Sequence, residues 1–229
     1  MTNIIGIFKE TLEYKNLGLN ALTISAIATI IFSLLQAYGI LKQGKEIRQK
    51  KSGESIAPIF FVYNFLYFFI FFIYGLYENS IAIILNGALS FLYLPILVGL
   101  NKYKGFTKKE ILLSLLMLPI IPAMFIYPEK NQLLFFFSGL SIIVVIRQFK
   151  ELLRKKDLGA LSLKYIWMFF ITSIFWCMYF MATKKWLLEI PCLTGTMLYA
   201  LILVMQRRWK IEERLAPLTF YALWRMPKK

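Results

Sequence analysis

The chain has 229 residues, of which 59% are apolar and 17% are aromatic, and its mean hydropathy is +0.64. The apolar residues come in long runs, which excludes a single soluble core and predicts a protein whose solvent is the lipid bilayer. A formal charge of +15 would suggest nucleic-acid binding in a soluble protein. Here the basic residues stand between the apolar runs, so orientation in a membrane explains them better than nucleic acid does.

The composition gives little support to enzymatic or metal chemistry. Histidine, the commonest general base and transition-metal ligand, is absent from the sequence. Cys177 and Cys192 lie inside apolar runs and show neither a disulfide framework nor metal-ligand spacing. No acid pair, nucleophile–base set or phosphate-binding loop is evident. We therefore predict that the protein is not an enzyme and uses no metal and no cofactor.

Residues 1–18 form a predicted extracytoplasmic leader that carries charges before any long apolar run begins. Ile4, Phe8 and Leu12 recur every four residues, which is typical of a helix lying in the membrane interface. A frayed terminus is the alternative interpretation. We expect no cleavable signal peptide, because the first span can act as its own signal anchor.

Seven apolar runs follow, each close to the roughly 20 residues that cross a bilayer. They are predicted as Leu19 to Leu41, Ile56 to Leu76, Ile81 to Leu100, Ile111 to Tyr127, Leu133 to Leu153, Tyr165 to Met181, and Trp186 to Met205. The fourth run contains Pro119 and Pro122, so we expect a kink in that span.

Lysine and arginine are distributed unequally between the two sides of the predicted membrane. Five lie after the first span, four after the third, six after the fifth and seven in the tail, against five in total on the other side. The positive-inside rule places the N-terminus outside and the basic tail, residues 207–229, in the cytoplasm. An odd number of spans also requires opposite ends, so the two arguments agree. We predict a multi-pass protein of the cell membrane.

The sequence contains an internal repeat with a constant shift of 105 residues. Gln43 then corresponds to Gln148, and the same shift brings Tyr74 onto Tyr179. Because the two segments agree in order and keep register through the following span, we infer a common origin.

The repeat divides the chain into a first three-helix unit at 19–100, a linker helix at 101–130 and a second three-helix unit at 131–206. Three is odd, so the linker helix is needed to make the two units parallel. Parallel repeats occur in transporters that bind their solute between the repeats near the membrane midplane. A duplication without a transport role is the alternative.

A series of short motifs has a recognisable order and spacing. They are Gln43, Lys51-Ser52, Glu54-Ser55, Tyr74-Gly75, Asn86-Gly87, and Pro191-Cys192 with Gly195. Together they resemble the PQ-loop superfamily and, within it, the SWEET (MtN3/saliva) sugar transporters, over about residues 19–210. The resemblance implies an all-α membrane fold of seven transmembrane helices, arranged as two parallel three-helix repeats plus a linker helix (3+1+3). It also implies sugar transport by a uniporter.

This sequence departs from the family pattern at the proline of the Pro-Gln motif. Lys42 stands there in the first repeat and Arg147 in the second. Family members use prolines in these helices as hinges. The resemblance therefore leaves Gly39, Pro58 and Gly75 as the hinge candidates in this chain.

The resemblance also implies a substrate pocket between the repeats. The candidate substrate-binding residues are Asn86, Trp176, Cys192, Thr172, Phe71 and Tyr67. Trp176 matches the pocket tryptophan of the family, and Cys192 replaces the asparagine of the seventh span. An amide in hydrocarbon costs several kcal/mol without a partner, so Asn86 should face the protein interior.

The spans hold few ionisable groups. Their acids, Glu151 and Glu189, lie near helix ends, whereas proton-coupled carriers usually bury an ionisable group. We therefore predict a facilitator that moves a small polar solute, a mono- or disaccharide, down its gradient by alternating access. A cystinosin-type carrier of amino acids or other metabolites and a non-transporting membrane scaffold are the alternatives. The predicted partners are the solute and the lipid bilayer, and assembly into a homo-oligomer is left open.

Overall fold

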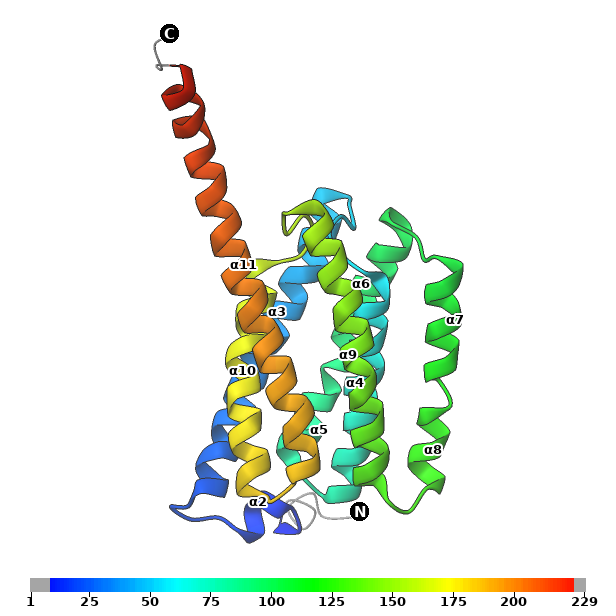
Figure 1. The fold of residues 1–229 in the computed structure, drawn as a ribbon. Helices are drawn as coiled ribbons and strands as arrows, with labels where there is room; N and C mark the ends of the chain where they lie inside the picture. The colour runs from blue at the N-terminus through cyan, green and yellow to red at the C-terminus, as the bar shows by residue number, and fades with distance from the viewer. Residues whose placement is uncertain (1–8, 225–229) are drawn as a thin grey trace.

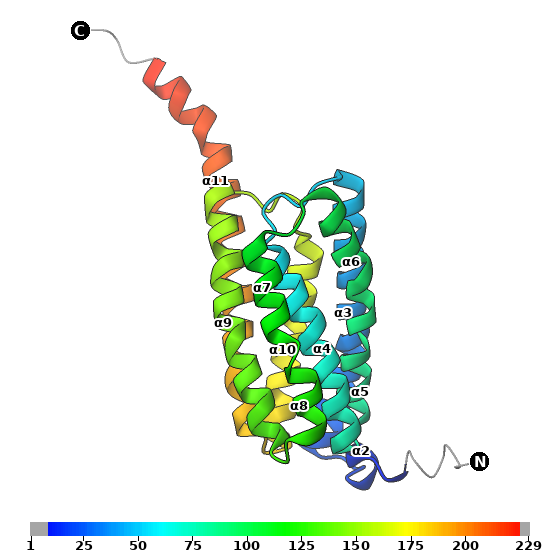
Figure 2. The same cartoon turned by 90° about the vertical axis from the view of Figure 1, so that its right-hand side faces the viewer.

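The computed structural model describes residues 9–224, and side chains for residues 9–211. The chain folds into one bundle of roughly parallel helices, from which the last helix projects (Figures 1 and 2). Seven helical segments in the described part are long and apolar enough to cross a membrane, and they coincide with the seven predicted spans. The all-α fold class predicted from the sequence is confirmed.

The helices follow the predicted order of the spans. Their bounds are α2 Leu12–Lys15, α3 Ala21–Lys50, α4 Pro58–Glu78, α5 Ile81–Ala88, α6 Ser90–Tyr103, α7 Lys108–Met117, α8 Ile120–Ile126, α9 Lys130–Lys155, α10 Leu163–Ala182 and α11 Trp186–Trp224. The pair α5 and α6 forms the third span, and the pair α7 and α8 forms the fourth.

Local sequence signals explain where several helices begin. The Asn20 side chain accepts a hydrogen bond from the Thr23 amide at the start of α3. Thr107 and Glu110 form a reciprocal capping box at the start of α7. Pro58 occupies the first turn of α4, where its missing N–H costs nothing.

Two spans are interrupted near their middle. The fourth divides at Pro119, between α7 and α8, as the two prolines of that run predicted. The third divides at Leu89, whose amide bonds to the carbonyls of Asn86 and Gly87 instead of one four residues back. No feature of the sequence predicts this second break. It lies directly after the asparagine that was expected to face the interior.

Two helices extend beyond their predicted spans. The helix α3 continues to Lys50, so the basic segment after Leu41 is helical and not a loop. The extension is packed, because Gln43 and Ile47 are fully buried and Ile47 lies against Gly99 of α6. The helix α11 continues to Trp224, so the predicted basic tail is helical over most of its length and stands clear of the bundle (Figure 1).

The bundle has two ends, which we name from their sequence. The basic end holds the turns 51–57, 104–107 and 156–162, and the leader end holds α2 and the turns 79–80, 127–129 and 183–185. In Figure 1 the turns 51–57 and 104–107 lie at one end of the bundle, and the turns of the leader end lie at the other. Of the predicted interfacial stripe, Leu12 is in α2, whereas Ile4 and Phe8 lie outside the described residues.

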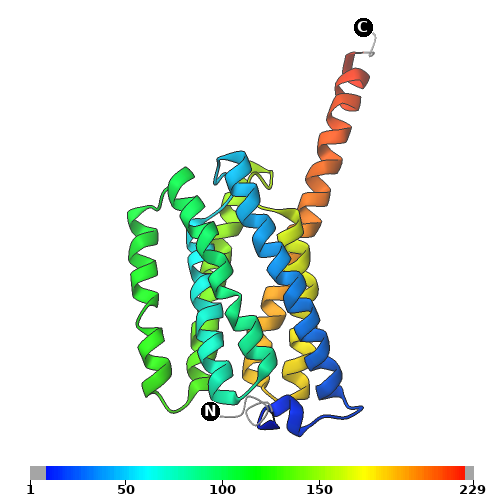
Figure 3. The ribbon, with the colours of Figure 1, turned by 180° about the vertical axis from the view of Figure 1, so that it is seen from behind.

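The two repeats contact each other through their first and second helices. The first helix of repeat one, α3, packs against α10 of repeat two, and α4 packs against α9. The linker helix, α7 and α8, lies at the edge of the bundle against α4 (Figures 2 and 3). This crossed pairing gives the two parallel repeats a shared interior.

Two matching glutamines join the repeats at the basic end. The Gln43 side chain donates to the Ala160 carbonyl (2.9 Å) and accepts from the Ser162 amide (2.7 Å). The Gln148 side chain makes the equivalent pair of bonds, donating to the Ser55 carbonyl (2.7 Å) and accepting from the Ala57 amide (2.9 Å). All four partners obey the 105-residue shift inferred from the sequence. We call this pair of buried side chains the glutamine clasp.

Candidate functional site

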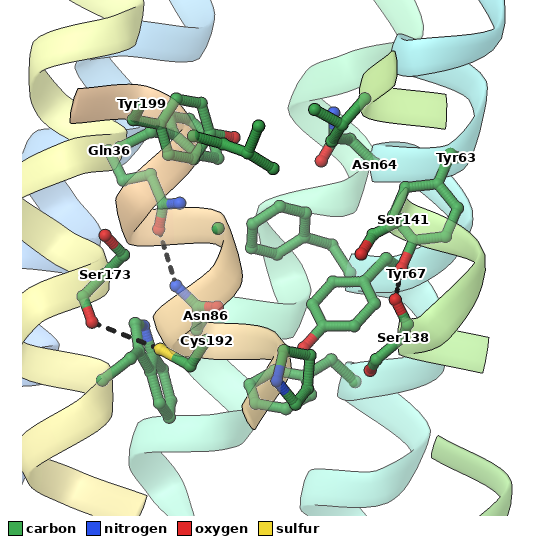
Figure 4. Close-up of a pocket in the computed structure, with 18 of the residues that line it drawn as sticks. Gln36, Tyr63, Asn64, Tyr67, Asn86, Ser138, Ser141, Ser173, Cys192 and Tyr199 are labelled. Atoms are coloured by element: carbon green, nitrogen blue, oxygen red, sulfur yellow. Dashed lines mark hydrogen bonds between the residues drawn. The ribbon is translucent and has the colours of Figure 1, made fainter. Parts of the chain in front are cut away.

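A cavity of about 140 Å³ lies between the two repeats, in the middle of the bundle. Its walls come from α3, α4 and α5 of repeat one and from α9, α10 and α11 of repeat two (Figure 4). Buried polar and aromatic side chains lie at both ends of the bundle. The glutamine clasp is buried at the basic end, and Tyr74 and Tyr179 are fully buried at the leader end.

Five of the six predicted substrate-binding residues line this cavity. They are Asn86, Trp176, Cys192, Phe71 and Tyr67. They come from four helices and both repeats, so no single segment of the sequence could form the site alone. That these residues bind a substrate stays a prediction.

The sixth candidate, Thr172, does not line the cavity. Its hydroxyl donates to the carbonyl of Met168 on its own helix (2.7 Å) and lies 3.0 Å from the carbonyl of Phe32 on α3. Threonine commonly bonds back to the preceding helical turn, and here that geometry turns the side chain toward α3. The structure thus gives Thr172 a place in the α3–α10 contact and not in the pocket.

Asn86 is held in place by α3. Its amide nitrogen donates to the Ser33 hydroxyl (2.9 Å) and to the Gln36 side-chain oxygen (2.8 Å). Both donor hydrogens are therefore used, which fixes the orientation of the amide and leaves its oxygen as an acceptor (Figure 4). The side chain is 3% exposed, so it faces the interior as expected.

Trp176 forms an aromatic wall with its neighbours. Its ring lies edge-on to Phe71 (5.2 Å between centroids) and against Phe180 (5.4 Å). Tyr67 stacks on the other side of Phe71 (5.7 Å). The indole Nε1 of Trp176 is buried with no hydrogen-bond partner. A buried unpaired donor beside a cavity is costly and is a candidate contact for a ligand oxygen.

Cys192 lies against a second thiol. Its sulfur donates to the Ser173 carbonyl (3.2 Å) and lies 3.1 Å from the Cys177 sulfur. Both thiols are free. A thiol is a weaker donor and acceptor than the asparagine amide that the family pattern has at this position. Repeat two therefore contributes less hydrogen-bonding capacity here than repeat one does through Asn86.

Several polar lining residues were not predicted from the sequence. They are Gln36, Asn64, Ser138, Ser141, Ser173 and Tyr199. Gln36 and Asn64 could have been found by the criterion applied to Asn86, since each is a lone amide within an apolar run. The serines carry no such signal, because a hydroxyl in a span often bonds to its own helix, as Ser138 does to the Leu134 carbonyl (2.7 Å).

The described residues that line the cavity are mainly apolar and aromatic, with several polar groups among them and no charged ones. Its described lining combines side-chain amides, hydroxyls and aromatic rings, and none of those lining residues is Asp, Glu, Lys or Arg. Such a surface can donate and accept hydrogen bonds and offer flat apolar area, but it cannot neutralise an ion.

The three hinge candidates have definite packing positions. A side chain at Gly39 would press on Met168 of α10, and one at Gly75 would meet the backbone of Ile84 on α5. Pro58 begins α4 immediately after the segment held by Gln148. Bending at these positions stays a prediction.

Comparisons with known proteins bear on the fold. No family model matches the sequence, and no curated protein matches it. Among solved structures, a eukaryotic SWEET transporter superposes with a TM-score of 0.53 at 15% sequence identity, covering 83% of this chain and 97% of that chain. The match covers most of both chains, so the chain is a multi-pass membrane protein with the fold of SWEET transporters.

Proposed function

We propose that the protein carries a small uncharged polar solute, most simply a monosaccharide, across the membrane by alternating access. The observation that carries this proposal is the uncharged cavity between the repeats, where amides and hydroxyls stand among aromatic side chains. Its position matches the midplane binding site of transporters built from parallel repeats.

The chemistry of the lining favours a polyol. The Asn86 oxygen accepts, the Trp176 Nε1 donates, and the rings of Tyr67 and Phe71 supply flat apolar surface. A sugar ring presents hydroxyls at its edge and C–H groups on its face, so it can use both kinds of contact at once. The polar groups of the cavity therefore suit the hydroxyl edge of a sugar ring, and its aromatic side chains suit the C–H face.

The size of the cavity favours a single ring. An apolar cavity of about 150 Å³ is known to hold one benzene molecule, and the cavity between the repeats measures about 140 Å³. A disaccharide would need substantial opening of the walls. We therefore propose a monosaccharide or a solute of similar size as the substrate.

The uncharged lining also weighs against the two alternatives. An amino acid carries an ammonium and a carboxylate, each of which is costly to bury without an opposite charge. A scaffold without a transport role would be expected to have a sealed midplane, without amides and hydroxyls around an interior cavity. With no buried acid among the lining residues, we propose uniport down the solute gradient, with the N-terminus outside and the basic end in the cytoplasm.

A binding measurement on purified protein tests the proposal, using tritiated hexose and three forms of the chain. Asn86→Ala removes the pocket acceptor, but it also leaves Ser33 and Gln36 unpaired. Ser33→Ala is the matched control, because it breaks one of those bonds outside the cavity. We expect saturable binding by the wild type and by Ser33→Ala, and a roughly tenfold or greater loss in Asn86→Ala. Equal binding by all three forms would show that the cavity is not the site.

A further inference from the structure

The leader segment is attached to the transport bundle. In α2, the Leu12 amide donates to the Asn79 carbonyl (2.9 Å) in the turn between α4 and α5. Thr11 is 5% exposed. The segment lies across the leader end of the bundle, next to α3 and α5 (Figure 3). It is therefore packed against the helices of the bundle.

The Glu13 carboxylate is the centre of this attachment. Three of its contacts are at the start of α5: the Ser80 hydroxyl (2.5 Å), the Ile81 amide (3.0 Å) and the Ala82 amide (3.2 Å). A carboxylate at a helix N-terminus satisfies free amides and complements the helix dipole. The fourth contact is different, because the hydroxyl of Tyr179 donates to Glu13 (3.0 Å) from α10.

These contacts join the two repeats. Ser80 and Ile81 belong to repeat one, whereas Tyr179 belongs to repeat two and also lies 2.9 Å from the Ser80 hydroxyl. Tyr179 is one residue from Phe180, which lines the cavity. The Glu13 carboxylate therefore bridges the start of α5 and α10 at the leader end, beside the wall of the cavity.

The repeat symmetry shows what Glu13 replaces. The 105-residue shift pairs Tyr179 with Tyr74 and Ser80 with Lys185. In the other half, Lys185 donates to the Tyr74 hydroxyl (2.9 Å) and forms an ion pair with Glu78 (2.6 Å). The Tyr74 half is therefore held by a charged group from within the repeats. In the half that contains Tyr179, the uncharged Ser80 stands at the position equivalent to Lys185. The charged group that contacts Tyr179 is instead the Glu13 carboxylate, which comes from the leader and not from either repeat.

We propose that Glu13 is a latch of the leader-end gate: its carboxylate ties α5 to α10 and holds the cavity closed on that side. Opening of the gate breaks the bond to Tyr179, while the bonds to the start of α5 keep the leader attached. The role of the latch in transport rests on the proposed function. The effect of the latch on access to the cavity is independent of that proposed function.

Thiol labelling measures that access directly. Cys192 lines the cavity, so in a Cys177→Ser background it reports entry of a membrane-impermeant maleimide. Labelling is measured in intact cells and in inside-out vesicles, which present the two membrane faces. Glu13→Gln removes the charge with little change in size, and Glu10→Gln is the matched control on the exposed face of the leader.

We expect Glu13→Gln to raise the labelling rate at least about fivefold from one face only, the face to which the leader belongs. Tyr179→Phe removes the bond between the repeats but leaves the cap of α5, and it should produce the same one-sided rise. Glu10→Gln should label like the parent. An unchanged rate in Glu13→Gln, an equal rise from both faces, or a rise in Glu13→Gln without one in Tyr179→Phe would overturn the latch. A chain that passes this test but moves no solute keeps the latch and loses the transport proposal.

Discussion

Replacing either glutamine of the clasp should open the basic end of the protein. Each of Gln43 and Gln148 makes two hydrogen bonds to buried backbone of the opposite repeat. Substitution by leucine keeps most of the side-chain volume but leaves one backbone N–H and one backbone C=O of the opposite repeat buried without a partner. Each unpaired group destabilises the closed form by about 1–3 kcal/mol. These groups regain water when the repeats separate, so the closed form loses about 2–6 kcal/mol relative to the open one. At 1.4 kcal/mol per factor of ten, the equilibrium for opening should shift by at least about 30-fold.

The same Cys192 reporter serves as the assay, now with labelling from the face of the basic end. Gln43→Leu and Gln148→Leu should raise the labelling rate by similar factors, because their bonding geometry is related by the repeat. Gln132→Leu is the control, since that glutamine is exposed on α9. If neither clasp variant changes labelling, or if one opens the cavity and its mate does not, the two glutamines do not hold the basic end closed together.

Three further predictions concern packing, orientation and the pocket. Gly87→Ala should destabilise the protein by about 1–3 kcal/mol, because a Cβ there would overlap the backbone of Phe72, whereas Gly139→Ala has open space and should not lower the melting temperature. Glu129→Cys should react with an impermeant thiol reagent in intact cells and Asp157→Cys should not, and the reverse pattern would contradict the orientation. Trp176→Phe should weaken solute binding by roughly 2- to 10-fold, because it removes the unpaired Nε1 donor, and should lower the melting temperature only through the ring packing it gives up. A fall in melting temperature with unchanged binding would mean that the indole only packs.

Much of the fold follows from one-dimensional patterns in the sequence. The apolar runs place the spans, Pro119 predicts the break in the fourth, and the shift that joins Gln43 to Gln148 predicts the parallel repeats. The break at Leu89 has no comparable signal. It depends on the packing of α5 against α4, where Gly87 meets Phe72. A contact of this kind between two helices produces no periodic pattern in the sequence.

The pocket was only partly predictable for a related reason. Asn86 and Trp176 stand out chemically, one as an amide in hydrocarbon and the other through a family pattern. Thr172 shares the helix of Trp176 but takes the rotamer that bonds Met168, and a sequence does not specify that choice. Ser80 shows the same limit at a gate. It reads as a surface loop residue, yet it is fully buried between Glu13 and Tyr179.

The most direct test of the account is solute uptake by purified protein in proteoliposomes, with a radiolabelled hexose, a disaccharide and leucine compared under identical conditions. We predict hexose equilibration down its gradient, faster than in empty liposomes and unchanged by an imposed proton gradient, with slower disaccharide entry and none of leucine. Uptake of leucine without any sugar, or accumulation of a solute against its gradient when a pH difference is applied, would contradict an uncharged, uncoupled pathway through the cavity between the repeats.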